Sequence, residues 1–333
     1  MTRRERVLRT LVGDRPDRPP VSFWRHFPEV DHDPARLAEA LVAFQRRYDL
    51  DLVKLMPSGV YGVEDYGCTV GDPDPVTGAK RVLHTPVDGP EGWAVLERPL
   101  PPDRGARGRE LRCLEQVRRA LGGVEDVPVL QTVFSPATTV AKAAGRDRWL
   151  TLLRGDPARA HRVLAAVART EQAFVAACLA AGADGVFFAT QLAGDGVLTE
   201  QEYATFGVPY DRVALEPLAG RQHLSVLHLH GAQPLFHLFA DYPLPIVNWH
   251  DRRTSPDLVE GRARWPRGAV AGGLDERGVV LQGPPARIRD DVVAVIRRTG
   301  GVRHLLAPGC VVPLATPAAH LDAVRAAVAS LHA

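Results

Sequence analysis

Two histidines and a cysteine form the clearest chemical pattern in this sequence of 333 residues. His228 and His230 lie two residues apart in an apolar run that predicts a β-strand, so both imidazoles face the same side of that strand. Cys310 ends another such run near the end of the chain. Three such ligands with a fourth position open are typical of a catalytic zinc site. We therefore expect zinc at these three residues; two hydrogen-bonded histidines lining a polar pocket are the alternative.

Three further side chains are candidates for substrate binding and proton transfer. Lys142, beyond the run at 127–134, can neutralise a substrate carboxylate, and Arg25 can hold one with two parallel hydrogen bonds. Solvated surface positions are the alternative for both. His250 is a candidate general acid or base, with Asp251 to orient it. Because neighbours on a strand end point in opposite directions, the sequence argues against a direct contact between these two.

The elements that must position these residues alternate along the whole chain. Eight runs rich in β-branched and aromatic residues predict strands at 20–24, 50–56, 127–134, 185–189, 224–230, 245–249, 269–274 and 305–312. Helical patterns lie between them. Asp33-Pro34 and Asp156-Pro157 predict helix starts, and residues 199–202 have the form of a capping box. The last two helices are expected at 284–298 and 317–331.

Eight strands that alternate with helices predict an α/β fold, a single (β/α)8 TIM barrel that forms one domain over residues 1–333. In such a barrel the carboxyl ends of all strands meet at one mouth, which would bring the two histidines and the cysteine together. A doubly wound sheet is the alternative, but no Gly-x-Gly-x-x-Gly follows the first strand. Residues 57–108, rich in Pro and Gly, are expected to form an extended loop on the active-site side.

Composition narrows the function classes. The 41 basic and 39 acidic residues nearly balance, and only three of the basic residues are lysines: Lys54, Lys80 and Lys142. Arginines interspersed with acids do not form the basic stripe of a nucleic-acid-binding protein, so no nucleic-acid partner is expected. No apolar run is long enough for a membrane span, and no signal peptide opens the chain. Four scattered cysteines argue for a reducing compartment, and we expect a soluble cytoplasmic protein.

Several segments along the chain resemble the uroporphyrinogen decarboxylase superfamily. They are residues 3–20 with Glu5-Arg6-Val7-Leu8, Phe134-Ser135-Pro136, Phe206-x-x-Pro209-Tyr210, Gly272-Gly273-Leu274-Asp275 and the late Pro308-Gly309-Cys310. The superfamily includes porphyrinogen decarboxylases, zinc-dependent corrinoid-protein:thiol methyltransferases and, more distantly, cobalamin-independent methionine synthases. The resemblance implies a single (β/α)8 barrel and a homodimer.

Residue by residue, the resemblance favours the methyltransferase branch. Arg25 matches the arginine of the true decarboxylases, but Lys54 and its neighbours offer no aspartate where those enzymes have one. Lys142 stands at their tyrosine position and Cys310 at their histidine position. The thiol methyltransferases bind zinc through His-x-Cys and a later Pro-Gly-Cys; His228 and Cys310 match these ligands, and His230 replaces the first cysteine.

Three hypotheses follow. The first is a zinc-dependent, methyltransferase-like enzyme in which His228, His230 and Cys310 hold the metal while Arg25 and Lys142 steer a small anionic or thiol substrate, with a corrinoid protein as the implied partner. The second is a divergent, metal-free decarboxylase acting on a tetrapyrrole or a smaller carboxylate. The third is a barrel that binds a corrinoid or porphyrin without catalysis.

Overall fold

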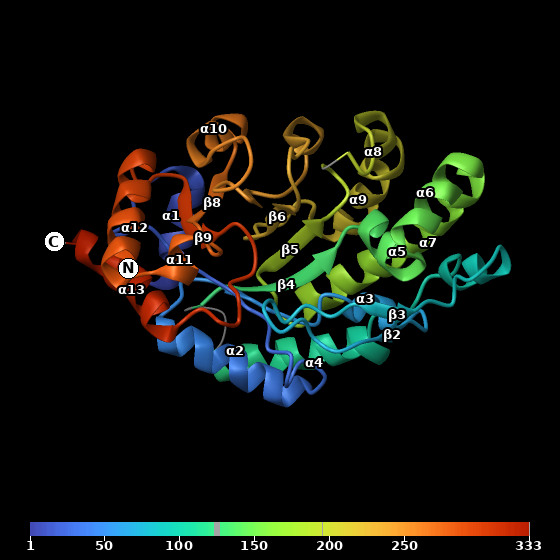
Figure 1. Ribbon diagram of the computed structural model, residues 1–333, viewed down its shortest axis with the longest axis horizontal. Helices are drawn as coiled ribbons and strands as arrows, with labels where there is room; N and C mark the ends of the chain where they lie inside the picture. The colour runs from blue at the N-terminus through green and yellow to red at the C-terminus, as the bar shows by residue number, and fades with distance from the viewer. Residues whose placement is uncertain (123–126, 195, 333) are drawn as a thin grey trace.

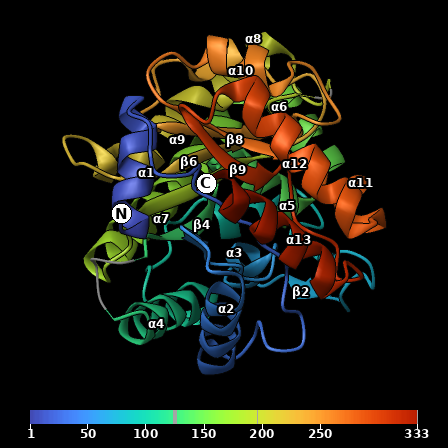
Figure 2. The same cartoon turned by 90° about the vertical axis from the view of Figure 1, so that its left-hand side faces the viewer.

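A computed structural model describes residues 1–122, 127–194 and 196–332. Its centre is a curled parallel sheet with helices around it (Figure 1, Figure 2). The strands lie in the order β1 (Val53–Lys54), β4 (Val129–Phe134), β5 (Gly185–Thr190), β6 (Val226–Leu229), β7 (Ile246–Trp249), β8 (Ala269–Leu274) and β9 (His304–Pro308). Every residue of these seven strands is buried, as expected for parallel strands covered on both faces. The prediction of an α/β fold with a parallel sheet is confirmed.

The expected first strand, at residues 20–24, is not a strand of this sheet. Val21 forms an isolated parallel bridge with Leu306 of β9. The Leu306 N–H donates to Pro20 O at 2.8 Å, and the Asp51 N–H donates to Val21 O at 2.9 Å. This segment therefore lies between β9 and the chain leading to β1, but prolines at its start lack N–H donors and shorten the ladder. The described sheet has seven strands, and the closed eight-stranded barrel stays a prediction.

The helices begin where the sequence predicts. Asp33 caps α2 by accepting from the Ala35 N–H at 2.9 Å, Asp156 caps α7 by accepting from the Arg159 N–H at 3.0 Å, and the capping box of Thr199 opens α8. The long helices are α1 (Arg3–Val12), α2 (Pro34–Tyr48), α4 (Gly105–Ala120), α5 (Pro136–Ala144), α6 (Arg146–Gly155), α7 (Pro157–Ala180), α12 (Pro285–Thr299) and α13 (Ala318–Ala329). The shorter ones are α8 (Glu200–Phe206), α9 (Val208–Leu215), α10 (Leu258–Arg264) and α11 (Val279–Gln282).

Residues 57–108 are more ordered than the extended loop expected from the sequence. They contain helix α3 (Tyr61–Glu64), an antiparallel pair of strands β2 (Thr69–Val70) and β3 (Val82–His84), and a 3-10 turn (Glu91–Leu96) before α4 begins. The strands are too short to show period-2 patterning, so the sequence gives no signal for them. The connection between β2 and β3 carries Lys80, which lines a cavity of about 480 Å³.

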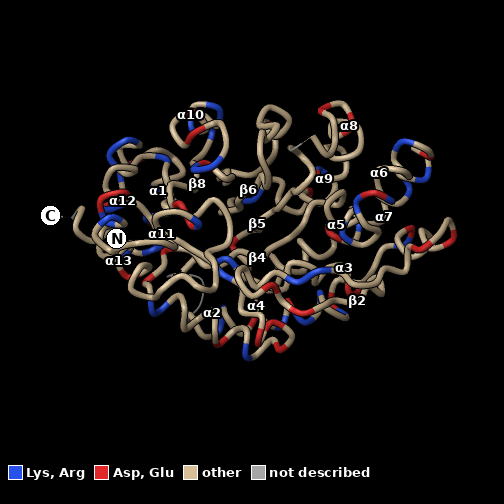
Figure 3. Tube along the Cα trace, viewed as in Figure 1, with Lys and Arg blue, Asp and Glu red and all other residues tan. Residues whose placement is uncertain are grey.

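Lys and Arg residues alternate with Asp and Glu residues along the whole chain trace and do not gather in separate regions (Figure 3). Of the described helices, α7 alone is long and apolar enough to cross a membrane, and 56% of its apolar window is buried within the fold, which is the pattern of a core helix. The fold therefore gives no evidence of a membrane protein.

Candidate functional site

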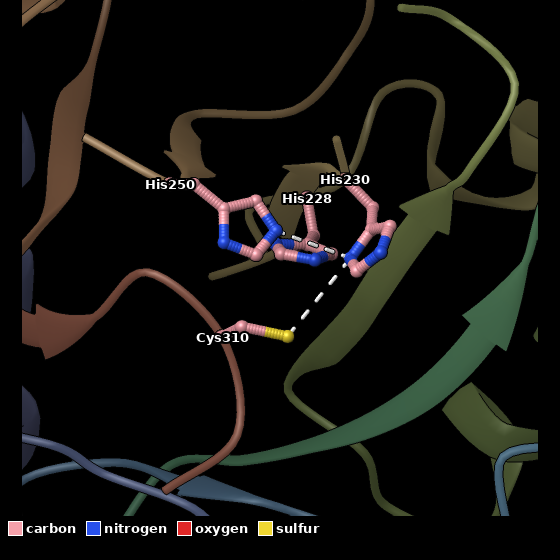
Figure 4. Close-up of side chains that lie close together, drawn as sticks. All are labelled: His228, His230, His250 and Cys310. Carbon is pink, nitrogen blue, oxygen red and sulfur yellow. Dashed lines mark hydrogen bonds between the residues drawn. The ribbon is translucent and has the colours of Figure 1, made fainter. Parts of the chain in front are cut away.

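Three histidines and one cysteine converge at the carboxyl ends of the strands (Figure 4). One ligand atom from each of His228, His230, His250 and Cys310 lies within 4.8 Å of the others. His250 Nε2 is 3.2 Å from His230 Nδ1, and Cys310 Sγ is 3.9 Å from the same nitrogen. In a tetrahedral zinc site with Zn–N bonds of about 2.0–2.1 Å, two nitrogens lie about 3.3 Å apart. The donor types and their spacing therefore fit zinc.

The sheet explains why these residues meet. His228 lies in β6, and His230 follows directly after that strand. His250 is the first residue after β7, which pairs with β6 so that Asn248 stands opposite His228. Cys310 comes two residues after β9. Parallel strands end at the same edge of a sheet, so side chains distant in sequence meet there.

Asn248 fixes the tautomer of His228. The Asn248 amide donates to Ala271 O at 2.8 Å and to Pro308 O at 3.0 Å, which identifies its nitrogen side. Its oxygen, 2.6 Å from His228 Nδ1, must therefore accept the proton of that nitrogen. The Nε2 lone pair of His228 is left for a metal ion, and such a fixed partner is typical of ligating histidines.

The Pro-Gly-Cys turn is shaped to approach the end of β7 closely. A Cβ at Gly309 would lie 2.9 Å from both the His250 Cα and the Trp249 O, so only glycine fits without a shift. The Gly309 N–H donates to the buried carboxylate of Glu276 at 3.2 Å. Together these contacts set the position of Cys310 beside His230.

Burial keeps the cluster uncharged in the absence of a metal. It lowers the pKa of His228 well below its usual range and that of His230 to about 4, with the neighbouring imidazoles adding to the effect. The same burial raises the pKa of the Cys310 thiol. At neutral pH the histidine lone pairs are available to a metal, and a bound cation would favour the thiolate form of Cys310.

His228, His230 and Cys310 line one side of a cavity of about 480 Å³. Its wall also holds every lysine of the chain, Lys54, Lys80 and Lys142, together with two arginines. Among the described residues that line it, none is Asp or Glu. The cavity is therefore suited to an anionic ligand of small-molecule size.

Two of these lysines are held against aromatic rings. Lys142 Nζ donates to Gly59 O at 2.6 Å and lies 3.5 Å from the centroid of the Phe134 ring. Lys54 Nζ lies 4.1 Å from the centroid of the Phe187 ring. Burial lowers the pKa of each amine to about 7, and for Lys142 the charge of Lys54 contributes as well.

The structure brings most of the predicted site residues together. His228, His230, Cys310 and Lys142 lie at the cavity, and His250 joins the histidine cluster. His250 also borders an adjacent hollow of about 290 Å³. As the sequence suggested, its neighbour points elsewhere: the buried Asp251 carboxylate accepts from the Gly273 N–H at 3.0 Å.

Arg25 is the exception among the predicted residues. Its guanidinium lies over the Phe27 ring, 5.7 Å from the centroid, and it lines a separate small hollow with Phe23 and Phe44. Its position therefore gives no support to the predicted contact with a substrate carboxylate.

Sequence reasoning missed two functional candidates, Lys54 and Asn248. Lys54 had a usable signal, because it lies on the same strand face as the apolar residues Leu52 and Met56, and a face of this kind turns inward. Asn248 had none, because its role depends on the pairing of β7 with β6.

Comparison with known proteins gives one consistent family. Residues 2–331 match the model of the uroporphyrinogen decarboxylase (URO-D) family. Two uroporphyrinogen decarboxylases from Synechococcus strains are similar over nearly the whole chain. The protein of strain JA-3-3Ab is 26% identical, and the match covers 95% of this chain and 90% of that protein. The protein of strain JA-2-3B'a(2-13) is 25% identical, and the match covers 98% of this chain and 99% of that protein.

Solved structures share the fold at lower identity. A methyltransferase from Methanosarcina mazei superimposes over the full length of both chains with a TM-score of 0.83 and 21% identity. A putative vitamin-B12-independent methionine synthase from Listeria monocytogenes covers 93% of this chain and 95% of its own, with a TM-score of 0.56 and 13% identity. These identities support a common fold and leave the reaction to be argued from the site.

Proposed function

The chain belongs to the uroporphyrinogen decarboxylase family, and from this premise we propose that it is a zinc-dependent, methyltransferase-like enzyme that activates a thiol or anionic substrate. The observation that carries the proposal is the convergence of His228, His230, His250 and Cys310 within 4.8 Å at a cationic cavity. We take the curled sheet to act as a closed barrel, with the cavity at its mouth.

The residues present fit a zinc ion in type, spacing and protonation. His228 offers Nε2 because Asn248 holds its other nitrogen, and His230 offers Nδ1, which faces both His250 and Cys310. A bound zinc ion would supply Lewis acidity, which lowers the pKa of a coordinated thiol so that the thiolate forms at neutral pH.

Four protein ligands would fill a tetrahedral site, so a substrate needs one of them to leave. We assign this role to His250. His228 is fixed by Asn248 and Cys310 by the turn around Gly309, and His250 is the one residue of the four that does not line the 480 Å³ cavity but borders the adjacent 290 Å³ hollow. With its lone pair free, the His250 imidazole would accept the proton of a substrate thiol, which is the acid–base role expected from the sequence.

The substrate's anionic group would be held by the cavity wall. Lys142 and Arg277 both line it, and no carboxylate among the described lining residues competes for them. The methyl donor is expected to be a corrinoid, presented by a partner protein at the open side of the cavity.

Metal analysis of protein purified without a histidine tag tests the proposal. We expect about one zinc per chain in the wild type and its loss in Cys310→Ala and His230→Ala, while His250→Ala retains it with lower affinity. His237→Ala is the matched control, because His237 is exposed and pairs only with Glu200 in the described structure. A zinc-free wild type, or full retention in Cys310→Ala, would overturn the metal site.

A methyl-transfer assay tests the reaction itself. The zinc-loaded protein is incubated with methylcobalamin and a panel of small thiols that differ only in their second, anionic group. We expect methylation of the thiol with loss of the methyl–cobalt absorbance, and no turnover in Cys310→Ala. Full zinc occupancy without methylation of any thiol would reject the methyltransferase and keep the metal site.

A divergent decarboxylase is the second candidate, supported by the names of the curated relatives and by the acid-free, lysine-lined cavity. Anaerobic incubation with uroporphyrinogen tests it. Formation of products with fewer carboxylates would favour this candidate, and unchanged substrate would count against classical decarboxylation.

A further inference from the structure

The three lysines of the chain lie at one cavity but differ in their partners. Lys80 Nζ is 2.5 Å from the Asp31 carboxylate and 2.9 Å from His32 Nε2, and Lys142 donates to Gly59 O. Lys54 Nζ has no hydrogen-bond acceptor among the described residues. Its amine is thus the one buried lysine nitrogen of the described cavity wall whose hydrogen-bonding capacity is left to a ligand.

Apolar surroundings hold the Lys54 amine in place. Its Nζ lies 4.1 Å from the Phe187 ring centroid and 5.2 Å from that of Trp24, and the side chain is only 9% exposed. β1 fixes its backbone beside β4, because Lys54 pairs with Leu130. A desolvated lysine in an apolar pocket is an arrangement that makes an amine nucleophilic, and burial is the main influence on the pKa of Lys54.

We propose that Lys54 is a catalytic nucleophile that forms an imine with the ketone of a small 3-oxo acid and promotes its decarboxylation. The cavity wall supplies the other requirement, since Lys142 and Arg277 face the same space and can hold the carboxylate before it leaves. This activity goes beyond the metal-centred reaction proposed above and does not depend on it.

The steps balance without any further reactant. The Lys54 nitrogen attacks the ketone carbon, water leaves, and a C=N bond replaces the C=O bond. The bond between the carboxylate and its neighbouring carbon then breaks, carbon dioxide departs, and the electron pair moves toward the protonated imine to give an enamine. A proton from water adds to the carbon, and hydrolysis releases a ketone and restores the amine.

Burial also supplies a reactive protonation state. It lowers the pKa of Lys54 to about 7, so near neutral pH a substantial share of the amine is unprotonated.

Reductive trapping with acetoacetate and sodium cyanoborohydride tests the proposal on the full-length protein as purified. Peptide mapping should place the adduct on Lys54 and leave Lys80, Lys142 and the N-terminal amine unmodified, so the three lysines control for one another. Lys54→Gln should lose the adduct while keeping the wild-type circular dichroism spectrum, which shows that it is folded. An unmodified wild type, or an adduct confined to Lys80 or Lys142, would overturn the assignment.

Acetone formation from acetoacetate tests the decarboxylation step. We expect turnover by the wild type and a fall to the uncatalysed rate in Lys54→Gln. Trapping without acetone formation would reject the decarboxylation. Because the proposal is independent of the metal, both readouts should survive treatment with a chelator that removes any bound zinc. Failure of the zinc measurements and failure of this inference are therefore separate results.

Discussion

Two charged residues three positions apart show how differently the two ends of the sheet are built. Asp51, before β1, is fully buried and accepts from both Arg6 and Arg18, at 2.6 and 2.5 Å, and from the Val21 N–H at 2.8 Å. Lys54, at the end of β1, is 9% exposed, lines the cavity, and lies against the rings of Trp24 and Phe187 with no hydrogen-bond acceptor among the described residues. The buried charge of Asp51, at the start of β1, therefore has hydrogen-bonded partners of opposite charge. The amine of Lys54, at the end of β1, has none among the described residues.

The difference separates stability from function. A buried carboxylate with two arginines fixes the N-terminal segment against the sheet, and its loss would leave Arg6 with Asp17 alone and take from Arg18 its 2.5 Å carboxylate partner. A buried amine without an anion destabilises the fold, and a protein retains such a group where a ligand supplies the missing charge. In parallel α/β folds ligands bind at the carboxyl ends of the strands, which agrees with the position of Lys54.

Removing the charge of Asp51 should have the largest effect on the stability of the protein. We expect Asp51→Asn to lower the free energy of unfolding by roughly 3–5 kcal/mol, because Arg6 and Arg18 would remain buried with their shared partner neutralised. Urea denaturation followed by circular dichroism measures this. A loss below about 1 kcal/mol would mean that the two ends do not differ as described.

Replacing Asn248, which holds the His228 ring, should weaken zinc binding more than it changes the stability of the fold. Asn248→Ala frees the His228 ring from its fixed tautomer, and we expect metal affinity to fall about 10–100-fold. Competition with a fluorescent zinc chelator measures the change. His237→Ala again serves as the control, and equal affinities in both variants would contradict the role given to Asn248.

Removing the unsatisfied charge should stabilise the protein. In metal-free protein at pH 6 we expect Lys54→Met to raise the free energy of unfolding by roughly 1–3 kcal/mol, since an unpaired buried amine is replaced by an apolar chain. The gain depends on pH in a defined direction. The pKa of Lys54 is about 7 in the folded protein against 10.5 for a solvated lysine, so the unfolded state binds more protons between these values, and wild-type stability rises there.

The advantage of Lys54→Met should therefore be full below pH 7 and disappear as the pH approaches about 10.5. Denaturation curves of the two proteins across this range provide the measurement. A constant difference at all pH values would show that the lysine binds its proton equally in the folded and unfolded states, and therefore that folding does not lower its pKa.

The smallest effect is expected at an exposed ion pair. Asp322→Ala removes the 2.6 Å contact with Arg47, and both side chains are about half exposed. We expect a change in unfolding free energy within about 1 kcal/mol, which falls further in high salt. The unfolding free energy lost in this variant shows how much the removal of a surface acid costs, and the loss in Asp51→Asn can be compared with it.

The sequence predicted the parts of the fold that local chemistry determines. Six of the expected strands, those corresponding to β4 through β9, lie within a few residues of their predicted ranges, because long apolar runs bounded by turns are strong signals. The segment at 20–24 was harder, since its only strand-like feature is one bridge from Val21 to Leu306. The short β2–β3 pair inside residues 57–108 gave no pattern at all.

The candidate site was predictable to the extent that it follows strand ends. His228 and His230 could be paired by spacing, and Cys310 by its place after the last strand. The approach of His250 to that cluster depends on the turn after β7, which no spacing rule describes, and Arg25 turned toward Phe27 instead of the cavity. Strand order thus determines which residues meet, and local turns determine how they face.

The donor cluster also has a consequence for how the chain folds. Cys310 and His230 are 80 residues apart, and Cys310 arrives with β9, the last strand to be synthesised. Contacts this distant in sequence form late, because loop closure must precede them. An ion that binds all four side chains therefore binds only the completed fold and stabilises it by mass action, linking the final strand to the middle of the chain.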